Sequence, residues 1–576
     1  MKYLSKMKHK FLVILILTVV LAPIKRVFAS GQSWDFDSKS TDGDGVNENN
    51  FSLDSGTWDV YDYGAKGDGK TLDTEAIQKA IDLCHKAGGG RVYLHNGIFY
   101  SATIYLKSHV TLYVEAGATL LGSGDAEDYA NTASDYPTYD GDYTSKALIY
   151  AENVINITIE GRGTIDGNGH VIDKRKLTDA YQYPSFQHRP RIIHMRGVEN
   201  IQIRDITLKN SASWVQTYQQ CRNLVIDGIT VDSRENKDIE QANREHSVKH
   251  RNTDGLDIVD CELVRIANCY INAGDDGIVL KSFSPDKACR DIVITNCVLS
   301  SGASGIKIGT ETTGRFEDIL VQNCVVFDTY GEGIAIMTAD GAIIQRVNIS
   351  NITLRNIKRQ AIFIRLSSRN KKFGTHTVTN SPVLKDIIIH NIKGTRLSPL
   401  GCSITGLVDT PLENIVLSNL DLEFEGGLTD VDPNHQVPVK PNGSPVGGMF
   451  GNYLPSYGFF VRNVKNLRLD QVQLRFAQDD VRPAMICDNV ELLNINGLKA
   501  QSIQKTSALI KLVNAKEVSI SQSRLTGNGA VFLEVKGEQS RDINLVNNNL
   551  KGVEQKYVIE QPLLKGIVQE FGTIEK

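Results

Sequence analysis

Short alternating runs of Ile, Val and Leu recur along this chain from about residue 153 toward its C-terminus. Each run spans about three to five apolar positions, follows Asn or another polar residue, and ends at a turn. Alternation with period 2 over so few residues is typical of a short β-strand. The copies begin near residues 153, 200, 223, 264, 292, 319, 347, 387, 415, 467 and 518.

Polar residues keep the same register as these runs. Four asparagines recur at spacings of 28, 27 and 28 residues: Asn268, Asn296, Asn323 and Asn351. The amide of Asn both donates and accepts, so asparagines at one corner can bond from coil to coil and satisfy the buried polar groups of a tight bend. The residues that follow the first three, Cys269, Cys297 and Cys324, keep the same spacing.

Units of this size are expected to stack and to bury one continuous core with atypical ends. We therefore predict an all-β fold, a single-stranded right-handed parallel β-helix of about ten coils, over residues 58–576. A β-sandwich or a propeller is the alternative, although a propeller should show a longer, four-strand period. The intervals 123–147, 168–190, 233–250 and 424–458 are predicted loops that wall a groove.

An amphipathic helix is predicted within residues 61–84, ahead of the repeats. Thr71 or Asp73 is its expected N-cap, and the glycines at 88–90 end it. Such a helix would cover the open end of a solenoid, where apolar interior and strand edges are otherwise exposed.

The N-terminal residues 1–29 resemble a secretory signal peptide. Four lysines precede an apolar run, Phe11–Pro23, that is short for a membrane span, and Val27–Ala29 resembles a cleavage site. An uncleaved anchor is the alternative. Residues 30–57 are polar and rich in Gly, Asp and Asn, which predicts a flexible N-terminal segment. The mature protein is thus expected to be secreted or periplasmic, without membrane contact.

Composition excludes few functions. The chain has 576 residues and a net charge of −4 without a basic stripe, so no nucleic-acid partner is expected. Its nine cysteines are an odd number without Cys-x-x-Cys spacing, which predicts mostly buried free thiols and no metal site. We expect a monomer.

Two short runs place three carboxylates close together in the sequence. Asp254 lies in Asn252–Gly255, whereas Asp275 and Asp276 lie in Gly274–Gly277, and Asp254 and Asp275 are 21 residues apart. That separation is close to one coil, and neighbouring coils lie roughly 4.8 Å apart. Hydrolysis of a sugar bond needs one protonated and one ionised carboxyl group. The alternatives for the Asp-Asp-Gly run are a plain turn or a calcium site.

These runs, together with Tyr63–Gly69 and Gly302–Gly309, resemble glycoside hydrolase family 28, the polygalacturonase and rhamnogalacturonan hydrolase family. The resemblance runs in order from about residue 58 to at least residue 360. It implies a right-handed β-helix, an inverting mechanism, no cofactor, and pectic polysaccharide or oligosaccharide as the substrate. By position, Asp275 matches the general acid, Asp254 and Asp276 the pair that activates water, Asn252 a site-shaping residue, and Lys281 a basic residue.

Crowding gives the same division of roles a physical basis. Three close carboxylates cannot all ionise cheaply, so one pKa should rise and that group keeps its proton. The resemblance implies that this group is Asp275. On a regular strand Asp275 and Asp276 would point to opposite faces, and the flanking Gly274 and Gly277 permit a bend that turns both outward.

The sequence departs from the family pattern in two places. The family's Gly-His-Gly is replaced by Gly302-Ala-Ser-Gly305, and its Arg-x-Lys by Ala335-Ile-Met337. A buried galacturonate carboxylate without a cation is costly, which favours another linkage, such as that of rhamnogalacturonan. Further candidate substrate contacts are Lys307, Glu311, Arg315 and Trp214, and also Arg189 and Arg191; a loop salt-bridge set or core packing is the alternative.

Two other functions are consistent with the same sequence. A calcium-dependent pectate-type lyase on the same scaffold would bind its ion at the three aspartates. A non-catalytic carbohydrate-binding solenoid would bind sugar without forming product.

Overall fold

The computed structural model describes residues 56–132, 134–137, 145–172, 189–234, 252–371, 381–432, 435–444, 447–560 and 566–574. The chain divides into Met1–Leu53 and Asp54–Lys576, and all described residues belong to the second unit. The predicted signal peptide and nearly all of the predicted segment 30–57 lie outside the described residues. The boundaries of these parts stay predictions.

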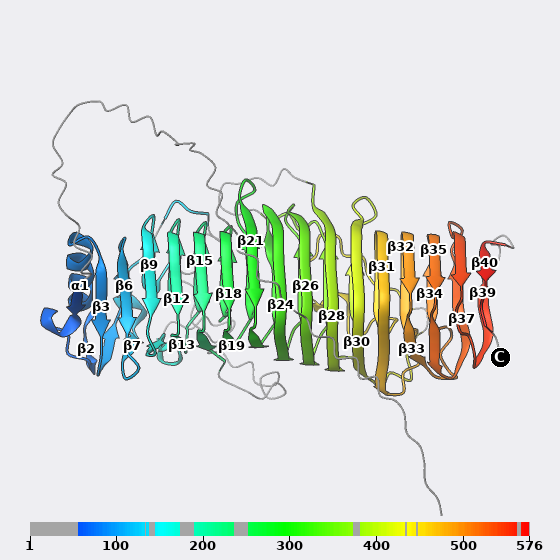
Figure 1. Ribbon diagram of the computed structural model, residues 1–576, viewed down its shortest axis with the longest axis horizontal. Coiled ribbons are helices and arrows are strands. Elements are labelled where there is room, and N and C mark those ends of the chain that lie inside the picture. Colours follow the sequence, from blue (N-terminus) through cyan, green and yellow to red (C-terminus); the bar gives the residue numbers. More distant parts are fainter. Residues whose placement is uncertain are drawn as a thin grey trace, which may run out of the picture. The chain divides into compact units, whose positions relative to one another are not determined.

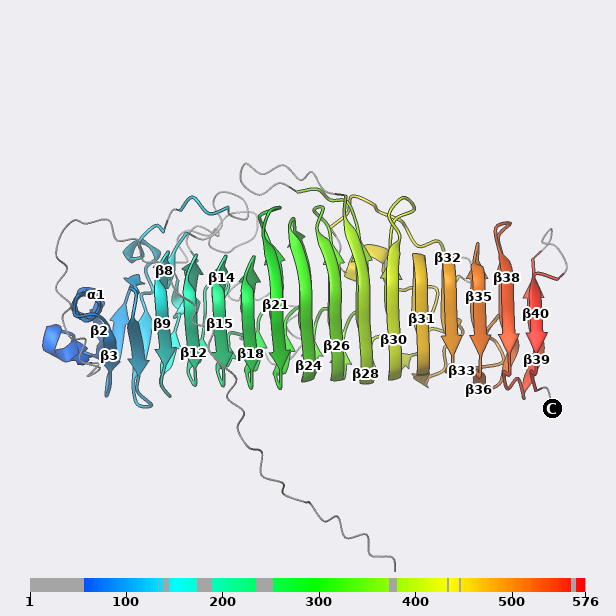
Figure 2. The ribbon, with the colours of Figure 1, turned by 45° about the horizontal axis from the view of Figure 1, so that its top comes forward.

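Parallel strands stack into three sheets that share one core (Figures 1 and 2). The first sheet, which carries the site, contains β5 (Ile104–Tyr105), β8 (Ala147–Glu152), β11 (Arg191–Arg196), β14 (Gln216–Gln219), β17 (Leu256–Val259), β20 (Ile278–Ser282), β23 (Ile306–Thr312), β25 (Ile334–Thr338), β27 (Ile362–Leu366), β29 (Cys402–Thr405), β31 (Phe459–Gln478), β32 (Met485–Asn496), β34 (Ile510–Val513), β37 (Gly529–Lys536) and β39 (Val553–Ile559).

The second sheet faces the viewer in Figure 1 and begins at the N-terminal end of the stack. It contains β1 (Thr57–Asp59), β3 (Gly90–Leu94), β6 (Val110–Val114), β9 (Ile155–Glu160), β12 (Glu199–Arg204), β15 (Arg222–Asp227), β18 (Glu262–Ala267), β21 (Ala288–Thr295), β24 (Arg315–Thr329), β26 (Ile343–Ile357), β28 (Val383–Leu397), β30 (Leu412–Gly426), parts of β31 and β32, β35 (Lys516–Ser521), β38 (Arg541–Val546) and β40 (Val568–Phe571).

The third sheet connects the other two. It contains β2 (Asp68–Leu72), β4 (Ile98–Ser101), β7 (Thr119–Gly122), β10 (Thr164–Asp166), β13 (Thr207–Lys209), β16 (Thr230–Asp232), β19 (Tyr270–Ala273), β22 (Val298–Ser301), the C-terminal parts of β24, β26, β28, β30 and β31, and then β33 (Lys499–Ser502) and β36 (Arg524–Gly527). The predicted parallel β-helix is therefore confirmed.

Alternation along each strand builds the core. In β18, Val264 and Ile266 are fully buried while Arg265 between them points outward. Val264 stacks on Ile292 of the next coil, and Ile266 on Ile294. Because this register repeats, aliphatic side chains form one continuous buried column through the stack.

The predicted number of about ten coils is too low. Among the described residues, the second sheet alone stacks seventeen strands, from β1 to β40. The first coils, such as Arg91-Val-Tyr-Leu94 in β3, have the alternation but lack the Asn and the long aliphatic run. Coils at an end pack against a cap on one side, so their sequences depart from the repeat.

The asparagine stack is confirmed, but it lies on the outside of the corner rather than in a buried bend. Asn296 Nδ2 donates to Asn268 Oδ1 at 3.4 Å, and Asn351 Nδ2 to Asn323 Oδ1 at 3.1 Å. All four are exposed and have φ between 55° and 57°. Asn tolerates this left-handed conformation better than most residues, so it both turns the chain and bonds from coil to coil.

The predicted capping helix is α1, Thr74–Lys86, at the N-terminal end of the stack (Figure 1). It buries Ile77, Ala80, Ile81 and Cys84 against the first coils. Asp73 is the N-cap residue, but its carboxylate accepts hydrogen bonds from the backbone N–H of Lys66 and Gly67 instead of capping the helix. The helix ends at Lys86, just before the predicted glycines at 88–90.

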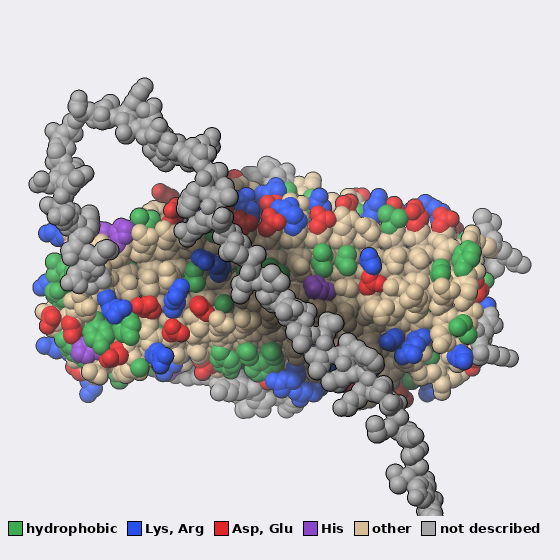
Figure 3. Space-filling view, in the orientation of Figure 1, with side chains coloured by type: hydrophobic (Ala, Val, Ile, Leu, Met, Phe, Trp, Pro, Cys, Tyr) green, Lys and Arg blue, Asp and Glu red, His purple; other side chains and the backbone are tan. Residues whose placement is uncertain are grey.

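All nine cysteines are buried free thiols, as predicted. Charged side chains of both signs are interspersed on the face shown in Figure 3. Within the described ranges, no helix combines the length and the apolar character needed to cross a membrane.

Candidate active site

The three aspartates lie at one turn of successive coils, between the third sheet and the first. Backbone bonds align these turns: Gly255 N donates to Asp276 O at 2.8 Å, and Gly277 N to Ser304 O at 2.8 Å. The same pattern places six residues in one row, here called the turn row: Trp214, Asp254, Asp276, Ser304, Glu332 and Gln360. Residues 22 to 40 apart in sequence are thereby neighbours.

Glycine after the turn row lets the coils approach closely. A Cβ atom on Gly255 would lie 2.5 Å from the carbonyl oxygen of Gly277, and one on Gly277 would lie 2.5 Å from that of Gly305. No side chain fits at such distances, so the glycines are needed for the spacing of the turn row. The chain also bends at Gly274 and Asp275, as predicted.

Asp276 is held by two donors from the next coil. Its Oδ1 accepts from Ser304 N at 3.1 Å, and its Oδ2 accepts from Lys307 Nζ at 2.7 Å. The carboxyl group is buried (3% exposed). Both contacts stabilise the charged carboxylate, and the ion pair raises the pKa of Lys307 even though burial opposes its charge.

Asp254 is held by a different lysine, which also comes from the next coil. Lys281 Nζ lies 3.2 Å from Asp254 Oδ2 and 2.9 Å from Asp257 Oδ1, and both carboxylates are buried. Asp254 Oδ1 has no hydrogen-bond partner in the part of the chain that the structure describes. Burial raises the pKa of Asp254, and Lys281 counteracts that rise.

Lys281 carries its charge in the interior. Burial lowers the pKa of Lys281, but the carboxylates of Asp257 and Asp254 outweigh burial and hold that pKa well above its ordinary value. The indole ring of Trp214 lies beneath the ammonium group, with Nζ 3.8 Å from the ring centroid. A cation over an aromatic face is stabilised further when it is desolvated.

Asp275 differs from its two neighbours in having no lysine partner among its described contacts. It is half-buried, and Asn252 Nδ2 donates to its Oδ2 at 3.4 Å. Burial, Asp254 and Asp276 together raise the pKa of Asp275 to about 8. Asn252 itself has φ 58°, a left-handed conformation that Asn tolerates.

Of the other predicted substrate contacts, Glu311 lies near Lys281, whereas Arg315 lies at the surface. Glu311 is buried, with its carboxylate 3.7 Å from Lys281 Nζ and 3.8 Å from Arg369 Nη2. Arg315 is exposed at the start of β24 and pairs with Glu317; in the described part of the chain, no hydrogen bond or ion pair joins it to the aspartates. Arg315 therefore belongs to a surface salt bridge, which was the alternative to a substrate contact.

Trp214 and the two arginines lie on the N-terminal side of the aspartates. Trp214 is 3% exposed and packs with Val259 and Phe283, so its ring has no face open to a sugar. Its ring instead stabilises the ammonium group of Lys281. Arg191 lies over the same ring at 4.7 Å, and Arg189 Nε donates to Ala212 O. All three side chains are buried.

Sequence reasoning missed two contributors. Asp257 completes the set of carboxylates around Lys281, and the backbone N–H of Ser304 donates to Asp276. Asp257 could have been found from the alternation in Leu256-Asp-Ile-Val259, which points an Asp outward in an otherwise apolar strand. The contact of Ser304 depends on the coil register, which only the structure supplies.

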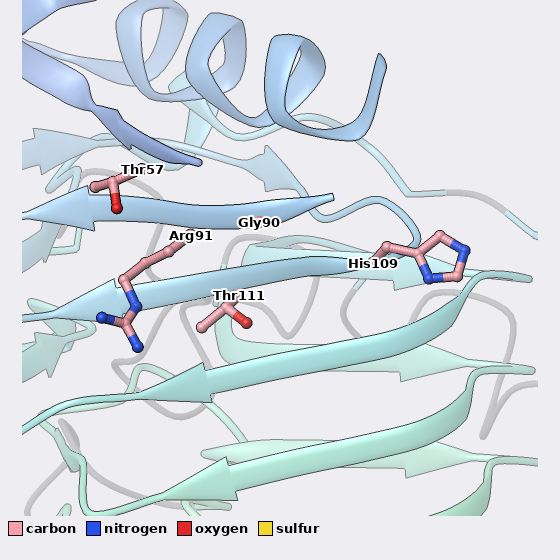
Figure 4. A pocket seen from close by; sticks show the side chains of 5 residues that line it. All are labelled: Thr57, Gly90, Arg91, His109 and Thr111. Atoms are coloured by element: carbon pink, nitrogen blue, oxygen red, sulfur yellow. The ribbon is translucent and has the colours of Figure 1, made fainter. Parts of the chain in front are cut away.

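A separate polar depression of about 310 Å³ lies at the N-terminal end of the stack. Thr57, Gly90, Arg91, His109 and Thr111 line it, on the side of β3 and β6 (Figure 4). It is remote in sequence from the aspartates. Within the described ranges, no group of three or more His, Cys, Asp or Glu residues is arranged to hold a metal ion.

The family model of glycosyl hydrolases family 28 matches residues 106–440, more than half of the chain. The chain belongs to this family. The match includes all three aspartates and every residue of the turn row. It ends within the interval 424–458, which was predicted to be a loop.

Two relatives and one solved structure show how far this family 28 protein resembles known ones. A "Probable polygalacturonase" of Vitis vinifera is 28% identical over 390 residues, covering 63% of this chain and 74% of the relative. An exo-poly-alpha-D-galacturonosidase of Dickeya chrysanthemi is 25% identical over 481 residues, covering 68% and 77%. An exopolygalacturonase structure from Thermotoga maritima has a TM-score of 0.52 at 21% identity, covering 64% and 87%. The shared fold confirms the predicted right-handed parallel β-helix.

Replacing Lys281 with Met should destabilise this family 28 protein strongly. The substitution leaves Asp254 and Asp257 buried without their cation, and removing one partner of a buried ion pair costs about 3 kcal/mol or more. The free energy of unfolding from urea titration measures the loss.

Lys465→Met provides the control, because Lys465 and Glu491 form an exposed pair with 48% and 42% of their side-chain surfaces accessible. Such pairs contribute less than about 1 kcal/mol. If both substitutions cost the same small amount, the buried lysine would not be compensating the carboxylates.

Proposed function

We propose that this protein hydrolyses glycosidic bonds of pectic polysaccharide with inversion, with Asp275 as the general acid and Asp254 and Asp276 as the pair that activates water. The main support for this proposal is the pairing of two of the three aspartates with lysines. Lys281 pairs with Asp254 and Lys307 with Asp276, whereas Asp275 has an amide neighbour instead of a cation. The three carboxyl groups thus differ in their partners, two with a lysine and one with an amide.

Asp275 meets the requirement for a general acid. A pKa of about 8 means that it carries its proton at neutral pH. It is also the most accessible of the three aspartates, since Asp254 and Asp276 are each 3% exposed. A protonated carboxyl group that reaches the substrate can donate to the oxygen of the leaving sugar.

Asp254 and Asp276 suit the task of the base. They are adjacent in the turn row, and Asp254 Oδ1 is a buried acceptor without a donor in the described part of the chain. A water molecule bound between two carboxylates loses its proton to them as it attacks the sugar carbon. Inversion requires the acid and the base roughly 6.5–9.5 Å apart, with the water between them.

The lysines act on the aspartates in this proposal, rather than on the substrate as first expected. Lys307 Nζ already contacts Asp276 at 2.7 Å, and Lys281 is 4% exposed and surrounded by carboxylates. A positive charge beside a carboxyl group favours its charged form, and Asp275 has no such partner among its described contacts. The chemistry needs no cofactor, because the carboxyl groups supply both the proton and its acceptor.

The substrate class rests on the family and on the names of its members. The relatives named above are a polygalacturonase and an exo-poly-alpha-D-galacturonosidase, which supports galacturonan or rhamnogalacturonan as the substrate. The N-terminal sequence supports action outside the cytoplasm, in a secreted or periplasmic protein. We expect the enzyme to act as a monomer.

A panel of substrates tests the reaction. Purified protein is incubated with polygalacturonan, rhamnogalacturonan and their oligomers, with and without chelator, and products are separated by chromatography. Saturated products that form in the presence of chelator are expected from at least one substrate. Asp275→Asn should lower kcat by about 10²–10⁴-fold, because it removes the proton donor.

Asp291→Asn provides the control, since Asp291 is an exposed aspartate outside the turn row. Its activity should equal that of the unmodified protein. Unsaturated products that absorb ultraviolet light and require calcium would indicate a lyase, and sugar binding without product would indicate a non-catalytic solenoid; either result contradicts the proposal.

The pH dependence of kcat/KM tests the role of Asp275. Because the protonated form is active and the pKa of Asp275 is raised to about 8, activity should fall as pH rises through about 8. The measurement is kcat/KM between about pH 3 and 10. An ordinary aspartate loses its proton near pH 4, so an alkaline limb centred near pH 4 to 5 would contradict the assignment.

A further inference from the structure

We propose that this enzyme removes short products from the ends of its polysaccharide, because the face that carries the aspartates is closed two coils farther along. This inference rests on the proposed function. The closure is made by residues 437–444 and 447–454, here called the covering segment. Its short helix η6, Gly447–Phe450, lies over β25 and β27 of the first sheet.

The covering segment bonds directly to the turn row. Gly447 N donates to Glu332 Oε1 at 2.7 Å, and Gln360 Nε2 donates to Gly447 O at 3.0 Å. Glu332 Oε2 accepts from Ser304 Oγ at 2.7 Å, and the backbone N–H of Ser304 donates to Asp276. The turn row thus runs from the catalytic aspartates directly into residues that protein atoms cover.

Along the outward side of the first sheet, a charged residue near the site is likewise followed by residues that protein atoms cover. In register with Lys307 lie Ala335 on the next coil and Phe363 on the one after. These side chains are buried with Met449 and Phe450, and the rings of Phe363 and Phe450 lie 6.3 Å apart. An outward face becomes apolar where protein, rather than water or sugar, covers it.

Farther anchors hold the covering segment along its length. Arg365 Nη2 donates to Val439 O at 2.8 Å, Ser368 N to Pro441 O at 2.7 Å, and Arg462 Nη1 to Val437 O at 2.8 Å. Arg365 and Arg462 come from different coils, so the segment is attached across several strands. These contacts attach the covering segment to the folded surface at several points.

The position of the covering segment limits how many sugar units of the substrate can extend past the aspartates. Glu332 lies two coils from Asp276 in the turn row, which is about 10 Å at ~4.8 Å per coil. A polysaccharide that passes the aspartates in this direction therefore ends within a few sugar units. This also accounts for the apolar Ala335 and Met337 at the positions where a carboxylate-binding cation pair was expected, because no sugar reaches them.

The first test compares how the viscosity of polymeric substrate falls with the number of new reducing ends. Removal of short products from ends leaves the viscosity nearly unchanged while reducing ends accumulate, and short oligosaccharides are the first products. A steep fall in viscosity during the first few per cent of cleavage would overturn the proposal. Absence of any product from pectic substrates would instead contradict the proposed function, and this inference with it.

Gly447→Ala tests the covering segment itself. A Cβ atom there would overlap Glu332 Oε1 and Gln360 Oε1, so the substitution should displace η6. We expect longer first products and at least a several-fold steeper loss of viscosity per bond cleaved. Phe450→Ala, which removes the packing on Phe363 without touching Glu332, should shift the product pattern in the same direction.

Gly443→Ala is the matched control, because a Cβ atom on Gly443 would lie 3.4 Å or more from its neighbours. This variant should give the same products as the unmodified protein. Cleavage of the shortest accepted oligomer reports whether each variant retains its catalytic residues. If the Gly447 and Phe450 variants cleave that oligomer yet keep the original product pattern on polymer, the covering segment does not limit the substrate and the proposal is wrong.

Discussion

Repulsion among three neighbouring carboxyl groups is the interaction on which the rest of the site depends. Coils about 4.8 Å apart bring Asp254 and Asp276 next to each other, and Asp275 adjoins Asp276 in sequence. Two negative charges at that separation repel each other by about 3 kcal/mol at an effective dielectric constant of about 20. Two buried lysines offset this repulsion for two of the groups, whereas burial and its two neighbours raise the pKa of the third, Asp275, to about 8. In the proposed mechanism, the division between acid and base follows from where the lysines lie.

The same stacking explains why one sheet performs two tasks. Its outward positions carry Asp257 and Lys307 on the coils of the site, and Ala335 and Phe363 on the coils that follow. The first set holds charges and the second binds the covering segment. A solenoid permits such a sharp boundary because each coil contacts only its neighbours, so the character of the surface can change from one coil to the next.

Local sequence patterns predicted the features that depend on one coil. Alternation gave the strands, the asparagine spacing gave the corner, and the glycines around Asp275 and Asp276 gave the bend. The surroundings of Lys281 could not be predicted in this way, because Asp254, Trp214 and Glu311 reach it from three other coils. The contact between Gly447 and Glu332 joins residues 115 apart in sequence, and no periodicity signals it. The first coils escaped the count because their sequences lack the Asn and the long aliphatic run of the repeat.

The stereochemistry of the first product tests the division of roles among the aspartates most directly. Proton NMR can follow hydrolysis of an oligosaccharide before the new reducing end mutarotates. If Asp275 donates the proton while Asp254 and Asp276 activate water on the opposite face, the first product carries the anomeric configuration opposite to that of the bond cleaved. A first product with the retained configuration would mean that one of these carboxylates attacks the sugar itself, which contradicts the account.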